Sequence, residues 1–207
     1  MAVAISVTSA VRELRRMHPD ADVRTLHLDR HEPRQALFEH RVDAVVTRLP
    51  FPTDGLRVSV LYDEARVLVV PLGHRLAGKE SVTVDDLAGE PMPRMRGWRP
   101  RVERLLAPRT APRFPVPDGP YVDEVEDEFE LVAAGQTVAV SAAAPGFVLR
   151  PYLTSVPLDG VAPSQVVLAT RADDRSRLVT AFRKVARTHL TGAVPPPAQQ
   201  QRGDAGG

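Results

Sequence analysis

The chain has 207 residues, enough for one large or two small domains, and its 43% of hydrophobic residues supports a packed core. A net charge of +1 is by itself too small to indicate attraction to nucleic acid or to a membrane. The absence of cysteine excludes disulfides and thiolate metal sites, and no apolar run is long enough to span a bilayer. The first residues reverse the charge order of a secretion signal, so we expect a cytoplasmic protein with no membrane partner.

Residues 2–17 carry two patterns at once. Alternation at residues 3, 5 and 7 is typical of a strand. Steps of three and four residues, typical of a helix face, join Val3, Val7, Ala10, Leu14 and Met17. The length and the Ala-, Arg- and Glu-rich interior favour a helix, which Pro19 ends. Whether residues 3–7 belong to this helix or form a strand stays open.

Strands and helices then alternate along the first third of the chain. Residues 23–28 alternate as a strand does, Pro33 suits the first turn of a helix that runs to about His40, and residues 42–47 form a short apolar strand. Helix, strand, helix and strand with short connections predict a parallel sheet that is covered by helices.

The rest of the chain carries signals for further strands and helices. Thr83 followed by Asp85 and Asp86 indicates a capped helix that Gly89 stops. Residues 107–120 are proline-dense and predict a loop or an extended edge. We expect further strands at residues 58–62, 66–71, 137–141 and 165–170 and helices at residues 123–134 and 176–190 (capped by Asp174 or Ser176), followed by a disordered tail at 191–207.

One ordered set of motifs resembles the effector-binding domain of LysR-type transcriptional regulators. It comprises His18-Pro19, the segment DAVV at 43–46, Gly55-Leu56, VVP at 69–71 with HRLA at 74–77, and Val82 to Pro91 (VTVDDLAGEP). LVAAG at 131–135 followed by VAV at 138–140 continues the order, and the similarity covers residues 10–190.

The resemblance implies an α/β fold of two Rossmann-like lobes, similar to type 2 periplasmic binding proteins, with a ligand cleft between the lobes. Strands 66–71 and 165–170 would cross between the lobes and lie side by side. The first lobe would then contain residues 1–69 and 170–190, and the second lobe residues 70–169. The family's winged helix-turn-helix has no counterpart before Met1, so we expect DNA binding only through a domain that is missing here. The first strand of the family's first lobe also has no clear counterpart in this sequence.

The family also implies a function. We expect a domain that senses a small anionic or aromatic effector, a carboxylate in particular, and that needs no cofactor or metal. The homodimer would form through the first helix and residues 23–28 of one chain against the second lobe of the other. The alternative is a stand-alone cytoplasmic solute-binding protein of the same fold. A further rival, an enzyme on this fold, would need an acid/base pair in the cleft, and no such motif occurs.

The candidate ligand contacts follow predicted strand ends, where helix N-termini and free backbone N–H groups favour a small anion. They are Thr8 and Ser9 (if residues 3–7 are a strand), His31, Thr47, Arg48, Leu49, Arg96, Trp98, Asp123 and Ser141. Arg48 would bind a carboxylate of the ligand through two hydrogen bonds. The alternative is that Arg48 is a surface arginine at the start of a loop.

Other candidates have plain alternatives too. His31 is a ligand donor or an exposed loop histidine, and Trp98 beside Arg96 is an aromatic wall or packs on the proline-rich loop. Asp123 is a ligand contact or a helix N-cap. The acidic run 123–128 is a solvated helix face and not a metal site.

Overall fold

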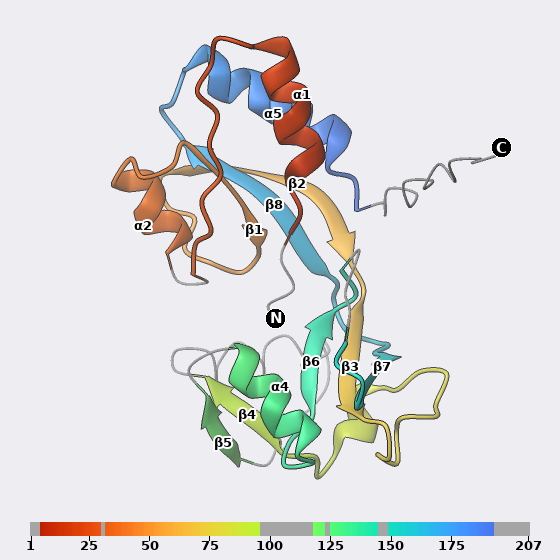
Figure 1. Cartoon of the computed structure of the whole chain (residues 1–207). Helices are drawn as coiled ribbons and strands as arrows, with labels where there is room; N and C mark the ends of the chain where they lie inside the picture. Colours follow the sequence, from red (N-terminus) through yellow and green to blue (C-terminus); the bar gives the residue numbers. More distant parts are fainter. Residues whose placement is uncertain (1–4, 30–31, 96–117, 123–124, 145–148, 193–207) are drawn as a thin grey trace, which may run out of the picture.

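The chain builds two three-stranded sheets and one two-stranded pair, which the computed structural model shows within residues 5–29, 32–95, 118–122, 125–144 and 149–192 (Figure 1). The helices are α1 (Thr8–Met17), α2 (Pro33–Phe38), the 3-10 helix η1 (Val84–Leu87), α4 (Val125–Ala133) and α5 (Arg177–His189). The strands are β1 (Ala44–Arg48), β2 (Leu56–Glu64), β3 (Arg66–Pro71), β4 (Met92–Met95), β5 (Asp118–Val122), β6 (Ala139–Ala142), β7 (Leu153–Pro157) and β8 (Ser164–Arg171). We call α1, α2, β1, β2, β8 and α5 the first lobe, and β3 to β7 with η1 and α4 the second lobe.

The first lobe is a sheet with helices on both faces. β8 lies between β1 and β2, and both neighbours run antiparallel to it. Leu168 of β8 packs with Ala10 of α1 and Ala186 of α5, whereas the next residue, Ala169, packs with Leu37 of α2. Because successive side chains of a strand point to opposite faces, α1 and α5 cover one face of the sheet and α2 the other.

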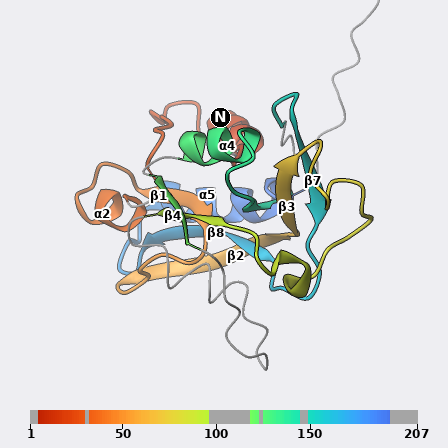
Figure 2. The same ribbon diagram turned by 90° about the horizontal axis from the view of Figure 1, so that it is seen from below.

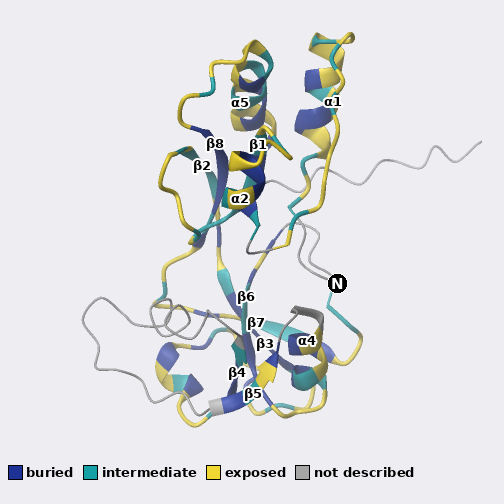
Figure 3. Cartoon of the chain, turned by 90° about the vertical axis from the view of Figure 1, so that its left-hand side faces the viewer, coloured by how far each residue is buried: buried dark blue, intermediate teal, exposed yellow. Residues whose placement is uncertain are grey.

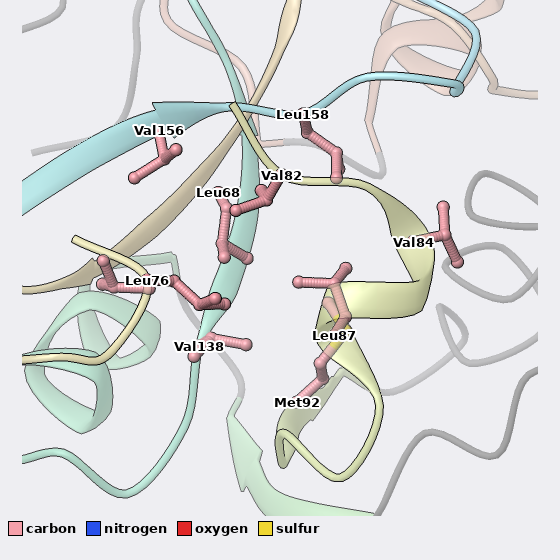
Figure 4. Close-up of a cluster of buried hydrophobic side chains, with 10 residues drawn as sticks. Leu68, Leu76, Val82, Val84, Leu87, Met92, Val138, Val156 and Leu158 are labelled. Atoms are coloured by element: carbon pink, nitrogen blue, oxygen red, sulfur yellow. The ribbon is translucent and has the colours of Figure 1, made fainter. Parts of the chain in front are cut away.

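The second lobe has its own core around β3. This strand lies between β6 and β7, both antiparallel to it. Leu68 and Val70 belong to the cluster drawn in Figure 4, and Val69 packs on the other face against Phe129 and Val132 of α4. With both faces covered, the strand is apolar throughout instead of alternating. Figure 3 shows the buried residues in two groups, one around β8 and one around β3.

A short parallel pair completes the second lobe. β4 and β5 lie on the opposite side of this lobe from β7 (Figure 1, Figure 2). The backbones approach so closely that a Cβ atom on Gly119 would overlap the carbonyl oxygen of Met92. Glycine at this position therefore permits the pairing.

The chain passes between the lobes at two neighbouring points. One is Ala65, between β2 and β3, and the other is residues 158–163, between β7 and β8. At these points Leu158 N donates to Arg66 O at 3.0 Å, and Glu64 lies opposite Ser164. The expectation that strands 66–71 and 165–170 lie side by side is wrong, because β3 pairs with β6 and β7 while β8 pairs with β1 and β2.

Two further predictions for the first lobe are wrong. Residues 23–28 form no strand, and Leu26 is 58% exposed. The predicted parallel sheet is not observed either, because β1 and β2 both run antiparallel to β8 in the described sheet. A strand needs a neighbour to complete its hydrogen bonds, and alternation alone does not provide one.

Several local predictions are confirmed. α1 ends at Met17, before His18-Pro19, although Met17 itself is exposed and not on the buried face. Thr83 and Asp86 form the expected capping box of η1. Ser176 caps α5 by accepting from Val179 N at 3.5 Å. No helix among the described residues has the length and apolar character needed to cross a membrane.

Candidate functional site

The carboxyl end of β1 lies beside the point where the chain changes lobe. Thr47 and Arg48 pair with Val167 and Val166 of β8, and Leu49 N donates to Gln165 O at 2.9 Å. Because β8 is held between two neighbours, it fixes where this end of β1 lies.

A partly buried ion pair joins this end of β1 to the end of β2. Arg48 Nε and Nη2 donate to the two carboxylate oxygens of Glu64 at 2.6 and 3.0 Å. The side chain of Glu64 is 2% exposed and that of Arg48 is 25% exposed. This fork-to-fork geometry is the arrangement in which arginine binds carboxylates best. Glu64 thus occupies the hydrogen-bonding edge that we expected a ligand carboxylate to use.

Two other polar groups lie near the ion pair. Burial raises the pKa of Tyr62, the negative charge of Glu64 raises it further, and Arg48 opposes the shift. Ser164, opposite Glu64, has a buried Oγ with no hydrogen-bond partner among the described residues. The crossing is therefore a region where polar side chains of β1, β2 and β8 lie close together.

In the second lobe, an arginine stacks on a tyrosine at the ends of the parallel pair. The guanidinium carbon of Arg94 lies 4.0 Å from the ring centroid of Tyr121, and Arg94 Nε donates to Gly119 O at 2.8 Å. The Tyr121 side chain is 65% exposed. A planar cation on an exposed ring forms a flat surface on which a planar molecule can stack.

The structure brings only some of the predicted site residues together. Thr47, Arg48 and Leu49 are consecutive at the end of β1, and Ser141 lies in β6 opposite Val67 of β3. His31, Arg96, Trp98 and Asp123 lie outside the described residues. Within the described part of the chain, no group of three or more His, Asp or Glu side chains could hold a metal ion.

Thr8 and Ser9 depended on a strand at residues 3–7. Residues 5–7 form no strand and residues 3–4 lie outside the described part, so this condition is not met for the described residues. Both residues lie at the start of α1. Ser9 Oγ donates to the His189 carbonyl oxygen at 3.0 Å. That bond ties α1 to the end of α5.

Sequence reasoning missed Glu64 and Arg94. Glu64 carries one signal, because it is a carboxylate in the middle of an extended segment that runs from β2 into β3. A charge at such a position is buried only with a partner. Nothing in the sequence indicates that the partner is Arg48, sixteen positions earlier.

The sequence is similar to a known family and to a known protein. Residues 2–191 match the family described as LysR substrate binding domain. A stretch of 82 residues is 27% identical to the HTH-type transcriptional regulator AlsR of Bacillus subtilis (strain 168). That stretch is 40% of this chain and 27% of AlsR, so the chain matches about a quarter of that protein's length.

Solved structures share the fold. The BenM effector binding domain with its effector benzoate is 21% identical, with a TM-score of 0.72, over 94% of this chain and 90% of that chain. The reduced form of the OxyR regulatory domain from Pseudomonas aeruginosa is also 21% identical, with a TM-score of 0.63, over 87% of this chain and 89% of that chain. Full-length BenM E226K has a TM-score of 0.73 and 20% identity, over 94% of this chain and 66% of that chain.

Proposed function

Because the chain belongs to the LysR substrate binding domain family, we propose that it is the regulatory domain of a transcription regulator, and that it senses a small-molecule effector. The transcription regulators among its relatives do not favour a stand-alone solute-binding protein. The proposal has three further parts. The regulator contacts DNA through a separate winged helix-turn-helix, it acts in the cytoplasm, and this domain catalyses no reaction.

The observation that carries the proposal is the double crossing between two separately packed sheets. Among the described residues, the chain passes between the lobes only at Ala65 and in the segment 158–163, which begins with Leu158 still packed in the second-lobe core. Short paired connections of this kind permit hinge motion, which lets a ligand that contacts both lobes favour one arrangement over another. We propose that residues 5–64 with 164–192, and residues 66–163, are the two units that move.

We place the effector between the lobes. Thr47 and Leu49 would contact it from the first lobe and Ser141 from the second, together with His31, Arg96, Trp98 and Asp123. Since Glu64 holds Arg48 by two bonds, we propose that Arg48 acts as a positioning residue that keeps Thr47 and Leu49 in place.

A small carboxylic acid, and an aromatic one in particular, is the proposed class of effector. The exposed face of Tyr121, with Arg94 stacked on its ring, supports a planar ligand. Benzoate, the effector in the BenM structure, is therefore the first compound to test.

A thermal-shift screen of benzoate and related acids tests the proposal. An effector raises the melting temperature, because it binds only the folded protein. Ser141→Ala reduces the shift, whereas Ser155→Ala in β7, opposite Val69 on the other side of β3, does not. If an acid is instead consumed, and His31→Ala abolishes that turnover, the protein is an enzyme and the proposal is wrong.

A further inference from the structure

Three arginine side chains lie near one another where α5 packs beside β2 in the first lobe. Arg57 lies in β2, an edge strand, and Arg183 and Arg187 lie one turn apart on α5. Arg187 Nη2 donates to Ser59 Oγ of β2 at 3.1 Å, which places the end of α5 beside this strand. We call Arg57, Arg183 and Arg187 the arginine patch.

Within the described part of the chain, no carboxylate forms an ion pair with any member of the arginine patch. Other arginines of the chain, such as Arg16, Arg24 and Arg150, each pair with an acidic side chain. Burial and the positive charges of Arg57 and Arg187 lower the pKa of Arg183. Arg57 and Arg187 therefore both repel Arg183, and no carboxylate of the described residues pairs with any of the three to compensate the charge.

The chemistry of the arginine patch suits phosphate. A guanidinium presents a planar fork of donors that binds phosphate oxygens in pairs, and successive phosphates of a nucleic acid would meet successive arginines. A protein partner would need an apolar centre, but Val60 is the only exposed large hydrophobic residue of the described part that lies in β2 or α5.

We propose that the arginine patch binds the sugar-phosphate backbone of DNA. This contact is independent of base sequence and adds to whatever a separate DNA-binding domain contributes. It rests on the proposed role in transcription for its biological meaning, but the binding itself is a property of this chain.

The test is the salt dependence of binding between the 207-residue chain and a fluorescent duplex of arbitrary sequence. Each phosphate contact adds about 0.9 to the slope of log K against log salt, so Arg57→Ala/Arg183→Ala/Arg187→Ala lowers the slope by about 2.7. Between about 50 and 200 mM NaCl the wild type then loses roughly 40-fold more affinity than the variant. Arg183→Gln alone lowers the slope by about 0.9.

The matched control is Arg16→Ala/Arg24→Ala/Arg150→Ala, which removes the same charge from paired arginines and leaves the slope nearly unchanged. Equal effects of the two triple variants, no binding by the wild type, or equal binding of polyglutamate or phosphatidylserine vesicles at the arginine patch would overturn the proposal. Circular dichroism checks that the variants fold. The effector-induced thermal shift is expected to survive in the patch variant, so failure here is distinct from failure of the effector role.

Discussion

Removing Arg48 from the Arg48–Glu64 pair is expected to destabilise the protein more than removing Glu64. Arg48→Met leaves a carboxylate that is 2% exposed without its partner, whereas Glu64→Gln leaves a guanidinium that is 25% exposed and can still reach water. Breaking a buried pair so that a charge stays buried costs about 3–5 kcal/mol. Losing a charged hydrogen bond while the remaining group is solvated costs only about 1.5–3 kcal/mol.

Urea unfolding followed by circular dichroism measures both differences in the free energy of unfolding. The double variant Arg48→Met/Glu64→Leu is expected to lie within about 1 kcal/mol of the wild type, because no uncompensated charge remains. Equal costs for the two single variants, or no cost for either, would refute the inference that Glu64 is buried and depends on Arg48. A double variant as unstable as Arg48→Met would refute it as well.

Three other substitutions have definite expected outcomes. Gly119→Ala lowers the melting temperature, because its Cβ would overlap the carbonyl oxygen of Met92 and force β4 and β5 apart. Lys79 and then Thr83 lower the pKa of Asp86 from 3.8 to about 2, so the charged form stabilises the fold; the stability advantage over Asp86→Asn is full above pH 4 and disappears as the pH falls toward 2. Leu26→Glu converts the proposed dimer to a monomer in sedimentation, because the exposed Leu26 lies in the segment expected at the dimer interface.

Each of these variants has a control in the same chain. A Cβ on Gly78 meets no atom within 4 Å, so Gly78→Ala leaves the melting temperature nearly unchanged. For Asp86→Asn the control is Asp85→Asn, which leaves the hydrogen bonds of Asp86 with Lys79 and Thr83 in place. Val60→Glu, on β2 where the side chain is 51% exposed, leaves the sedimentation coefficient unchanged. A control that behaves like its test variant contradicts the corresponding explanation.

Local signals in the sequence predicted much of the fold. The apolar run of β3, the capping box at Thr83 and the end of α1 before Pro19 each depend on neighbouring residues, so the sequence contains all the information they need. The family motifs, taken in order, predicted the two-lobed fold that the comparisons confirm.

Features that depend on distant residues could not be predicted. Residues 23–28 alternate as a strand does but find no pairing neighbour, and β7 (LTSVP) is too short and mixed to be recognised without β3 beside it. The same reason hid the site's main contact. Arg48 was identified as an anion-binding group, but only the placement of β1 and β2 on either side of β8 reveals that its anion is Glu64.

The most direct test of the central claim is calorimetric titration of an acid found in the thermal-shift screen into three proteins, namely the wild type, Thr47→Ala and Ser141→Ala. A ligand held between the lobes contacts both, so each substitution is expected to weaken binding, whereas Thr180→Ala on the exposed side of α5 is not. Binding that responds to a substitution in one lobe only, or in neither, would contradict a site between the lobes.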